Sequence, residues 1–216
     1  MLYFTKRLTK LIFGLFLYAL GIVFTLKANI GFAPWEVFHT GLGNTVGISI
    51  GVTSILTGLV IVAISALMGE KIGLGTLLNM LLIGLFLDFI LFLNLIPKME
   101  FWLYGFLMLV LGLFVISLAT YFYISSGFGA GPRDSFMVAL TRKTGLPVGL
   151  VRSSIELIIV VTGWLLGGMA GLGTLISVVG IGFCLQLTFR ALKFVPTSVH
   201  HASLQNTFKA ESSWVK

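Results

Sequence analysis

The stretch GFAPWEVFHTGL occupies residues 31–42, and GAGPRDSFMVAL occupies residues 129–140, 98 positions further along the chain. When residues 20–90 are laid over residues 118–188 without a gap, 21 of the 71 positions are identical. The matches gather at glycine and proline, which mark special backbone geometry and not merely apolar composition. A duplicated unit in an apolar chain is typical of membrane transport folds built from structural repeats.

The composition indicates an integral membrane protein. Apolar residues make up 57% of the chain and charged residues only 10%, and the mean hydropathy is +1.08. A soluble domain carries about a quarter charged residues. The net charge of +7 comes from basic residues at the ends of apolar segments, which is a topology signal, so no nucleic-acid partner is expected. The single Cys184 cannot form an intrachain disulfide and is interpreted as a small core residue.

Six apolar windows are long enough to span a bilayer core, which takes about 20 residues. The first apolar run, residues 11–26, is longer than the h-region of a signal peptide, which has about 7–15 residues, so it is interpreted as a retained helix. The sequence therefore predicts an all-α membrane protein with the lipid bilayer as its surroundings. The windows cover residues 9–27, 50–68, 74–96, 101–124, 149–167 and 171–192.

Each repeat holds three of these windows. The first repeat covers residues 1–97 and the second covers residues 98–194, and residues 195–216 form a polar tail. An odd number of spans leaves the second copy upside down relative to the first. The count therefore predicts two inverted three-helix repeats, related by a pseudo-two-fold axis in the membrane plane.

The basic residues give an orientation. With the N-terminus and the C-terminus in the cytoplasm, 12 lysines and arginines fall on the inner side, and only Lys27 and Lys98 fall on the outer side. This asymmetry follows the positive-inside rule, and Tyr121 and Tyr123 would lie in the inner aromatic belt. The inner set is Lys6, Arg7, Lys10, Lys71, Arg133, Arg142, Lys143, Arg152, Arg190, Lys193, Lys209 and Lys216.

The connectors after the first and fourth spans, residues 29–47 and 127–145, hold the densest motif matches. Each opens with glycine and continues with proline and an acid, which favour the first turn of a helix. Short helices are therefore predicted over residues 34–44 and 132–144. Two interpretations stay open: both helices lie at opposite interfaces, or both are re-entrant and offer free N–H groups to a ligand near the midplane. The candidate substrate-binding residues are Gly31, Pro34, Glu36, Gly129, Pro132, Arg133 and Asp134.

These connectors also resemble a known family. The stretches GFAPWEVFHTGL and GAGPRDSFMVAL, with the later IGLGTL and AGLGTL, look like the YczE/YyaS/YitT family of bacterial membrane proteins over residues 10–192. The resemblance implies a multi-pass protein of the bacterial cytoplasmic membrane, and it brings no substrate and no catalytic residue. Glu36 stands where the family is expected to carry Asp, a change that keeps the charge.

Ionisable residues inside the spans are candidates for proton or ion coupling, because burying them is costly. Glu156 lies in the fifth span, with Arg152 four residues before it on the same helix face. The pair either anchors the helix at the interface or takes part in a relay. Asp88, in the third span, is either solvated near the outer surface or part of such a relay. His39 could titrate, but a single histidine there is consistent with an amphipathic interface.

Glycines at four-residue spacing also have a structural interpretation. Gly163, Gly167 and Gly171 form a stripe of small residues. Such a stripe lets helices pack closely, and it would equally permit helices to slide during gating.

Several chemistries are disfavoured by missing motifs. The sequence has no GxxxxGK[ST] loop, no HExxH and no GxSxG, so no enzyme activity and no cofactor are expected. His200 and His201 lack carboxylate or cysteine partners at ligand spacing, so no metal site is expected.

Two classes of function remain. The first is a small secondary transporter or channel for an unidentified small or lipid-like solute, and the internal symmetry favours it. The second is an accessory protein that binds or stabilises a membrane or cytoplasmic partner. As partners, a second copy of the chain and another membrane protein both stay open. A highly charged substrate is disfavoured because the spans carry few charges.

Overall fold

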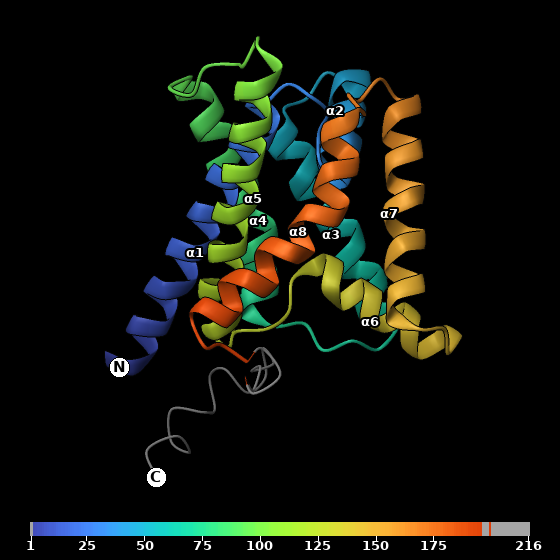
Figure 1. The fold of residues 1–216 in the computed structure, drawn as a ribbon. Coiled ribbons are helices and arrows are strands. Elements are labelled where there is room, and N and C mark those ends of the chain that lie inside the picture. The colour runs from blue at the N-terminus through green and yellow to red at the C-terminus, as the bar shows by residue number, and fades with distance from the viewer. Residues whose placement is uncertain (1, 196–198, 200–216) are drawn as a thin grey trace.

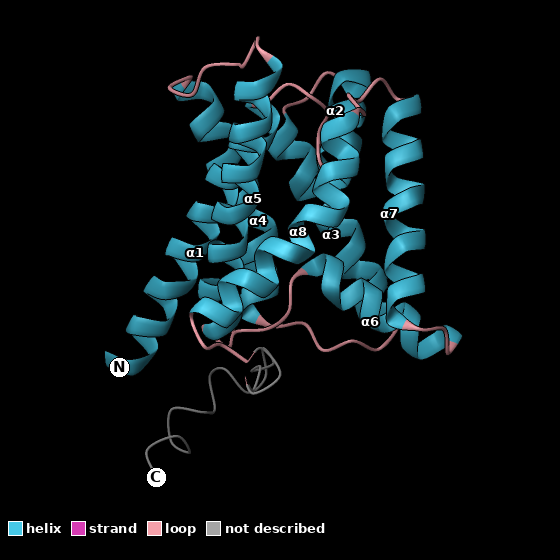
Figure 2. Ribbon diagram, in the orientation of Figure 1, coloured by secondary structure: helices cyan, strands magenta, loops and turns pink. Residues whose placement is uncertain are grey.

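The computed structural model describes residues 2–195 and 199, and this part of the chain forms eight α-helices and no strand (Figure 2). Six of the helices are long and apolar enough to cross a membrane, as predicted. The predicted tail falls almost entirely outside the described residues. The helices are α1 (Leu2–Lys27), α2 (Pro34–Val46), α3 (Ile50–Leu67), α4 (Leu74–Leu93), α5 (Trp102–Ser125), α6 (Pro132–Thr144), α7 (Val148–Leu165) and α8 (Leu172–Ala191).

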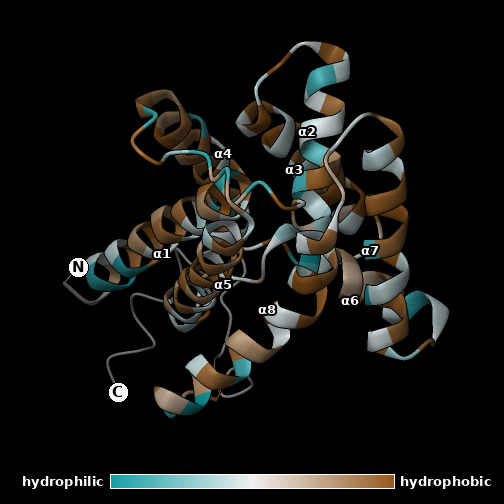
Figure 3. Ribbon diagram, turned by 45° about the horizontal axis from the view of Figure 1, so that its top comes forward, coloured by the Kyte–Doolittle hydropathy of each residue, from teal (hydrophilic) through white to brown (hydrophobic). Residues whose placement is uncertain are grey.

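The six long helices run between two ends of one bundle (Figure 1). Helices α1, α4 and α7 start at the lower end of Figure 1, where the N-terminus lies, and α3, α5 and α8 start at the upper end. The short α2 lies at the upper end and the short α6 at the lower end. Apolar residues cover much of the outward surface of the long helices (Figure 3), as expected for helices that face lipid tails.

Both short helices begin at the predicted proline. Helix α6 ends at the predicted Thr144, and α2 runs two residues past the predicted Asn44, to Val46. Pro34 and Pro132 occupy the first helical turn, where the missing N–H costs nothing. Both helices have 13 residues and stop at a left-handed glycine, Gly47 with φ 76° and Gly145 with φ 69°. Glycine adopts this conformation without the steric penalty that a Cβ brings.

Each connector pairs with the start of a long helix from the other half of the chain. The Gly173 N–H at the start of α8 donates to the Ile30 carbonyl at 2.7 Å. The Gly75 N–H at the start of α4 donates to the Phe128 carbonyl at 2.8 Å. The two bonds join positions that differ by 98 residues at both ends, so the same contact is made twice.

The connector glycines permit this close approach. Gly31 has φ 114°, and a Cβ built on it would lie 2.7 Å from the Gly171 nitrogen. Gly129 has φ 124°, and its Cβ would lie 3.0 Å from the Gly73 Cα. Any side chain at either position would push the connector away from the opposite helix start.

Helices α1 and α5 pack along each other more extensively than the other helix pairs of the described residues. Leu15 and Ala19 of α1 and Leu109 of α5 are fully buried. The buried hydroxyls of Thr25 and Ser117 donate to carbonyls of their own helices at 2.8 Å. Both hydroxyls therefore have a hydrogen-bond partner, which a polar group needs in apolar surroundings.

Candidate functional site

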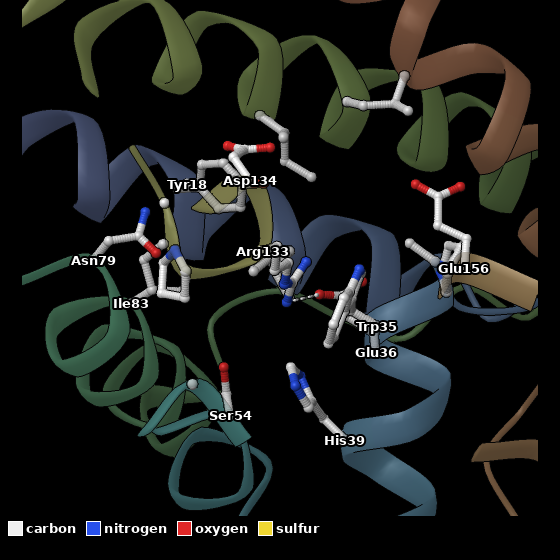
Figure 4. A pocket seen from close by; sticks show the side chains of 18 of the residues that line it. Tyr18, Trp35, Glu36, His39, Ser54, Asn79, Ile83, Arg133, Asp134 and Glu156 are labelled. Carbon is white, nitrogen blue, oxygen red and sulfur yellow. Dashed lines mark ion pairs between the residues drawn. The ribbon is translucent and has the colours of Figure 1, made fainter. Parts of the chain in front are cut away.

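A cavity of about 190 Å³ lies inside the bundle, and residues from all eight helices line it (Figure 4). The first turns of α2 and α6 both reach it, α2 from the upper end and α6 from the lower end. Two helices lying flat at opposite surfaces would not meet in this way. The geometry therefore favours the re-entrant interpretation of the two connectors.

The lining follows the repeat. Of its 29 residues, 26 form 13 pairs separated by 98 positions, so equivalent parts of the two halves face one cavity. The pairs are 18/116, 22/120, 33/131, 34/132, 35/133, 36/134, 39/137, 54/152, 57/155, 58/156, 79/177, 80/178 and 83/181.

The paired positions carry different chemistry. Trp35 is matched by Arg133, and Gly58 is matched by Glu156. The two sides of the cavity are therefore unlike in charge and in aromatic surface. Such a cavity can hold an asymmetric molecule in one orientation.

An ion pair joins the starts of the two short helices. The Arg133 Nη2 atom lies 3.6 Å from the Glu36 Oε1 atom, and the guanidinium lies 4.5 Å from the centre of the Trp35 ring. Glu36 is only 4% exposed. Burial raises the pKa of the Glu36 carboxyl, and the charge of Arg133 opposes that rise.

His39 is also part of the cavity, which corrects its interpretation as an interfacial residue. Its side chain is 2% exposed and lies one turn after Glu36 on α2. Burial lowers the pKa of His39 well below its usual value, and the nearby Arg133 adds to this. The imidazole is therefore neutral near pH 7 and can donate one hydrogen bond and accept another.

The predicted pair on α7 forms. The Arg152 Nε atom donates to the Glu156 Oε1 atom at 3.0 Å, and both residues line the cavity. The Arg152 side chain is half-exposed and the Glu156 side chain is less so. Proton coupling by Glu156 stays a hypothesis, and solute flux of Glu156→Gln measured across pH would refute it if the pH profile were unchanged.

Three other predicted residues lie outside the lining. Asp88 accepts hydrogen bonds from the Ser49 hydroxyl and, at 2.8 Å, from the Gly51 N–H, and so joins α4 to the start of α3. Gly31 and Gly129 pack against helix starts, as described above. The remaining candidates, Pro34, Glu36, Pro132, Arg133, Asp134, Arg152 and Glu156, all line the cavity, and their roles there stay predictions.

The sequence did not single out several polar residues of the lining, among them Tyr18 and Trp35. Asn79 and Ser177, by contrast, are identifiable from the sequence as a matched polar pair in otherwise apolar spans, and both line the cavity. Tyr123 was predicted in an aromatic belt, and this is wrong: it is buried and its hydroxyl donates to the Gly129 carbonyl at 2.8 Å.

Within the described residues, no group of three or more His, Cys, Asp or Glu side chains could hold a metal ion. His200 and His201 lie outside those residues.

Comparisons place the chain among uncharacterised proteins, and the predicted resemblance is confirmed. The profile of a family described as "Family of unknown function (DUF6198)" matches residues 5–190. The chain is 36% identical over 177 residues to "Uncharacterized membrane protein YczE" of Bacillus subtilis (strain 168), covering 81% of each chain. It is 30% identical over 191 residues to an uncharacterized protein of Haemophilus influenzae, covering 88% of this chain and 87% of the relative. "Uncharacterized protein YyaS" of Bacillus subtilis is 24% identical over 199 residues, 89% of this chain and 94% of the relative. No solved structure matches.

Proposed function

The chain belongs to the family of unknown function DUF6198 and is a multi-pass membrane protein, and from this premise we propose that it is a small secondary transporter. The observation that carries the proposal is the central cavity, whose lining is drawn in matched pairs from both halves of the chain. Transporters built from inverted repeats bind their substrates at the repeat interface, near the bilayer midplane. The protein acts through binding and release, without enzyme chemistry.

The inverted repeat is part of this proposal. Its support is the repeated hydrogen bond between a connector and the opposite helix start, together with the placement of α2 and α6 at opposite ends of the bundle. An accessory protein that only docks to a partner has no need of such matched halves.

The lining indicates a solute of mixed character. Its charges nearly balance, with Arg133 and Arg152 against Glu36, Asp134 and Glu156. Apolar side chains such as Ile83 fill much of the remainder. A modest-sized solute with one polar end fits this environment better than a polyanion or a polycation does.

Blocking the cavity should stop transport. Ser54 lies on α3 and lines the cavity, so Ser54→Trp places an indole in the solute's position. Leu56 lies two residues further on the same helix, is 48% exposed and does not line the cavity, so Leu56→Trp is the matched control. The measurement is uptake of a broad metabolite mixture into proteoliposomes. We expect uptake of at least one solute by the Leu56→Trp protein, and a decrease of at least tenfold for Ser54→Trp.

The proposal fails if no solute is taken up, or if both variants transport equally. In the first case an accessory role becomes the better interpretation. Equal transport would instead mean that the solute does not pass through this cavity.

We also propose that the protein lies in the bacterial cytoplasmic membrane with its lower end, and both termini, in the cytoplasm. Asn44, near the end of α2, and Lys143, near the end of α6, are both exposed and lie near opposite ends of the bundle. In a Cys184→Ser background, Asn44→Cys should react with an impermeant maleimide in intact cells, and Lys143→Cys should react only after lysis. Labelling of both from one side would refute the inverted topology.

A further inference from the structure

The two halves of the chain pack their last long helices differently. Helices α3 and α7 both pack against α2 and α6, but only α3 also packs along the long helix that follows it, α4. Helices α7 and α8, although described throughout, make no comparable contact with each other, and Figure 3 shows α7 standing apart from α8. At the 98-residue spacing, α7 is equivalent to α3 and α8 to α4. The interface between α3 and α4 is therefore closed, and the equivalent interface between α7 and α8 is open. We call these two interfaces the closed seam and the open seam.

Four glycines mark this difference. Gly51 and Gly84 bring the backbones of α3 and α4 together, and a Cβ built on Gly84 would lie 2.6 Å from the Gly51 carbonyl oxygen. Their equivalents, Gly149 and Gly182, have nothing within 4 Å of a built Cβ. Gly182 lies inside α8, where glycine weakens a helix relative to alanine, and Gly149 lies in the first turn of α7. The packing in this conformation therefore gives no reason for glycine at these two positions, whereas a closed seam would.

Side-chain hydrogen bonds hold the closed seam together, and the open seam lacks the equivalent residues. The Asp88 carboxylate accepts from the Ser49 hydroxyl and from the Gly51 N–H at 2.8 Å, which ties the upper ends of α3 and α4. The equivalents of Ser49 and Asp88 are Pro147 and Gln186. Proline has no hydroxyl to donate, and Gln186 is exposed at the lower end of α8.

We propose that the protein alternates between this conformation and a second one, in which α7 and α8 close through Gly149 and Gly182 while the upper ends of α3 and α4 separate. The exchange gives each half the packing that the other half has now. This exchange rests on the proposed transport function. It would open the cavity toward the lower end of the bundle in one conformation and toward the upper end in the other. In the present conformation, the hydrogen bonds of Asp88 hold the upper ends of α3 and α4 together.

A disulfide trap tests the second conformation directly. In a Cys184→Ser background, Pro147→Cys with Gln186→Cys places two thiols at the positions equivalent to Ser49 and Asp88, whose side chains touch where α3 and α4 are closed. Gly149 and Gly182 stay unchanged, because closed helices leave no room for a side chain there. A disulfide needs Cβ atoms about 3.5–4.5 Å apart, so it forms within one chain only if the seam closes. The control is Leu150→Cys with Gln186→Cys, because Leu150 is 53% exposed and its equivalent, Val52, also points outward from α3.

We expect mild oxidation in proteoliposomes to crosslink the 147–186 pair within one chain, at least tenfold faster than the 150–186 pair. Equal rates, or no intrachain crosslink, would overturn the proposal. Crosslinks between chains would overturn it too, because they would make the open seam a contact between copies.

A second arm tests the coupling between the two seams. Ser49→Ala removes one hydrogen bond from Asp88 at the opposite end of the bundle, which favours separation of α3 from α4. The population of the second conformation should rise, and the 147–186 crosslink should form about tenfold faster. An unchanged rate would refute the coupling. Neither arm requires a solute, so crosslinking without flux refutes transport alone, and flux without crosslinking refutes this exchange alone.

Discussion

Replacing Arg133 by Gln is expected to destabilise the folded protein by about 3 kcal/mol, because it leaves the Glu36 carboxylate buried without its partner. Glu36 is 4% exposed, and the Arg133 guanidinium lies 3.6 Å from it and over the Trp35 ring. Arg133 is itself one-third exposed, which places the cost at the lower end of the usual range of about 3–5 kcal/mol for a broken buried pair.

The defect should shrink as the pH falls. Burial already raises the pKa of Glu36, and removing Arg133 takes away the charge that opposes this rise. A carboxyl whose pKa is higher in the folded state than in the unfolded state binds more protons when folded. Its stabilising protonation is therefore present at low pH and lost as the pH rises through the folded pKa. We expect the unfolding temperature of Arg133→Gln to approach that of the parent protein toward pH 5 and to fall further below it toward pH 8.

Two variants serve as controls for this prediction. Glu36→Gln with Arg133→Gln removes both charges and should recover much of the loss. Arg152→Gln breaks a pair whose arginine is half-exposed, and it should cost about 1 kcal/mol or less. The measurement is the thermal unfolding midpoint in detergent, followed by tryptophan fluorescence. Equal midpoints for Arg133→Gln and Arg152→Gln at every pH would mean that Glu36 is not held in this buried contact.

The sequence predicted the elements of this site better than its contacts. The first turns of α2 and α6 were identifiable because proline, an acid and a terminal glycine have local effects on a helix. That Glu36 meets Arg133 was not predictable, since the two residues are 97 positions apart and only the packing of the two halves brings them together.

Carboxylates in apolar helices gave equal signals and had different outcomes. Glu156 and Asp88 each lie in a span, but Glu156 lines the cavity and Asp88 fastens α4 to α3. Hydropathy reports that a charge is present in a span, and not which neighbour its face meets. Only the register between packed helices decides this.

The glycines at four-residue spacing around the end of α7 show the same limit. Gly163, Gly167 and Gly171 were predicted to pack helices together. Gly163 packs closely against α2, whereas Gly167 has φ 88° and nothing within 4 Å of a built Cβ, so it ends the helix in a turn. Gly171 packs against the connector at Ile30. Four-residue spacing alone does not distinguish a packing surface from a helix end.

The second large effect is expected at Gly163, where α2 rests on α7. A Cβ built on Gly163 would lie 2.6 Å from the Val37 carbonyl carbon and still closer to the Phe38 nitrogen and Cα atoms. Backbone atoms cannot rotate away as a flexible side chain can. Gly163→Ala should therefore cost about 3 kcal/mol, the upper end of the usual range for overpacking.

The control for Gly163→Ala lies on the same helix. Gly149 lies in the first turn of α7 and has open space around its built Cβ and no unusual φ, so Gly149→Ala should leave stability nearly unchanged. Thermal midpoints of the two variants give the comparison, and equal values would show that α2 is not seated on α7.

The effect of Gly163→Ala should also reach the cavity. Glu36 and His39 lie on α2 on either side of Val37 and Phe38, so a displaced α2 carries both away from Arg133. If the Gly163→Ala protein still folds at low temperature, adding Arg133→Gln to it should then no longer lower its thermal unfolding midpoint.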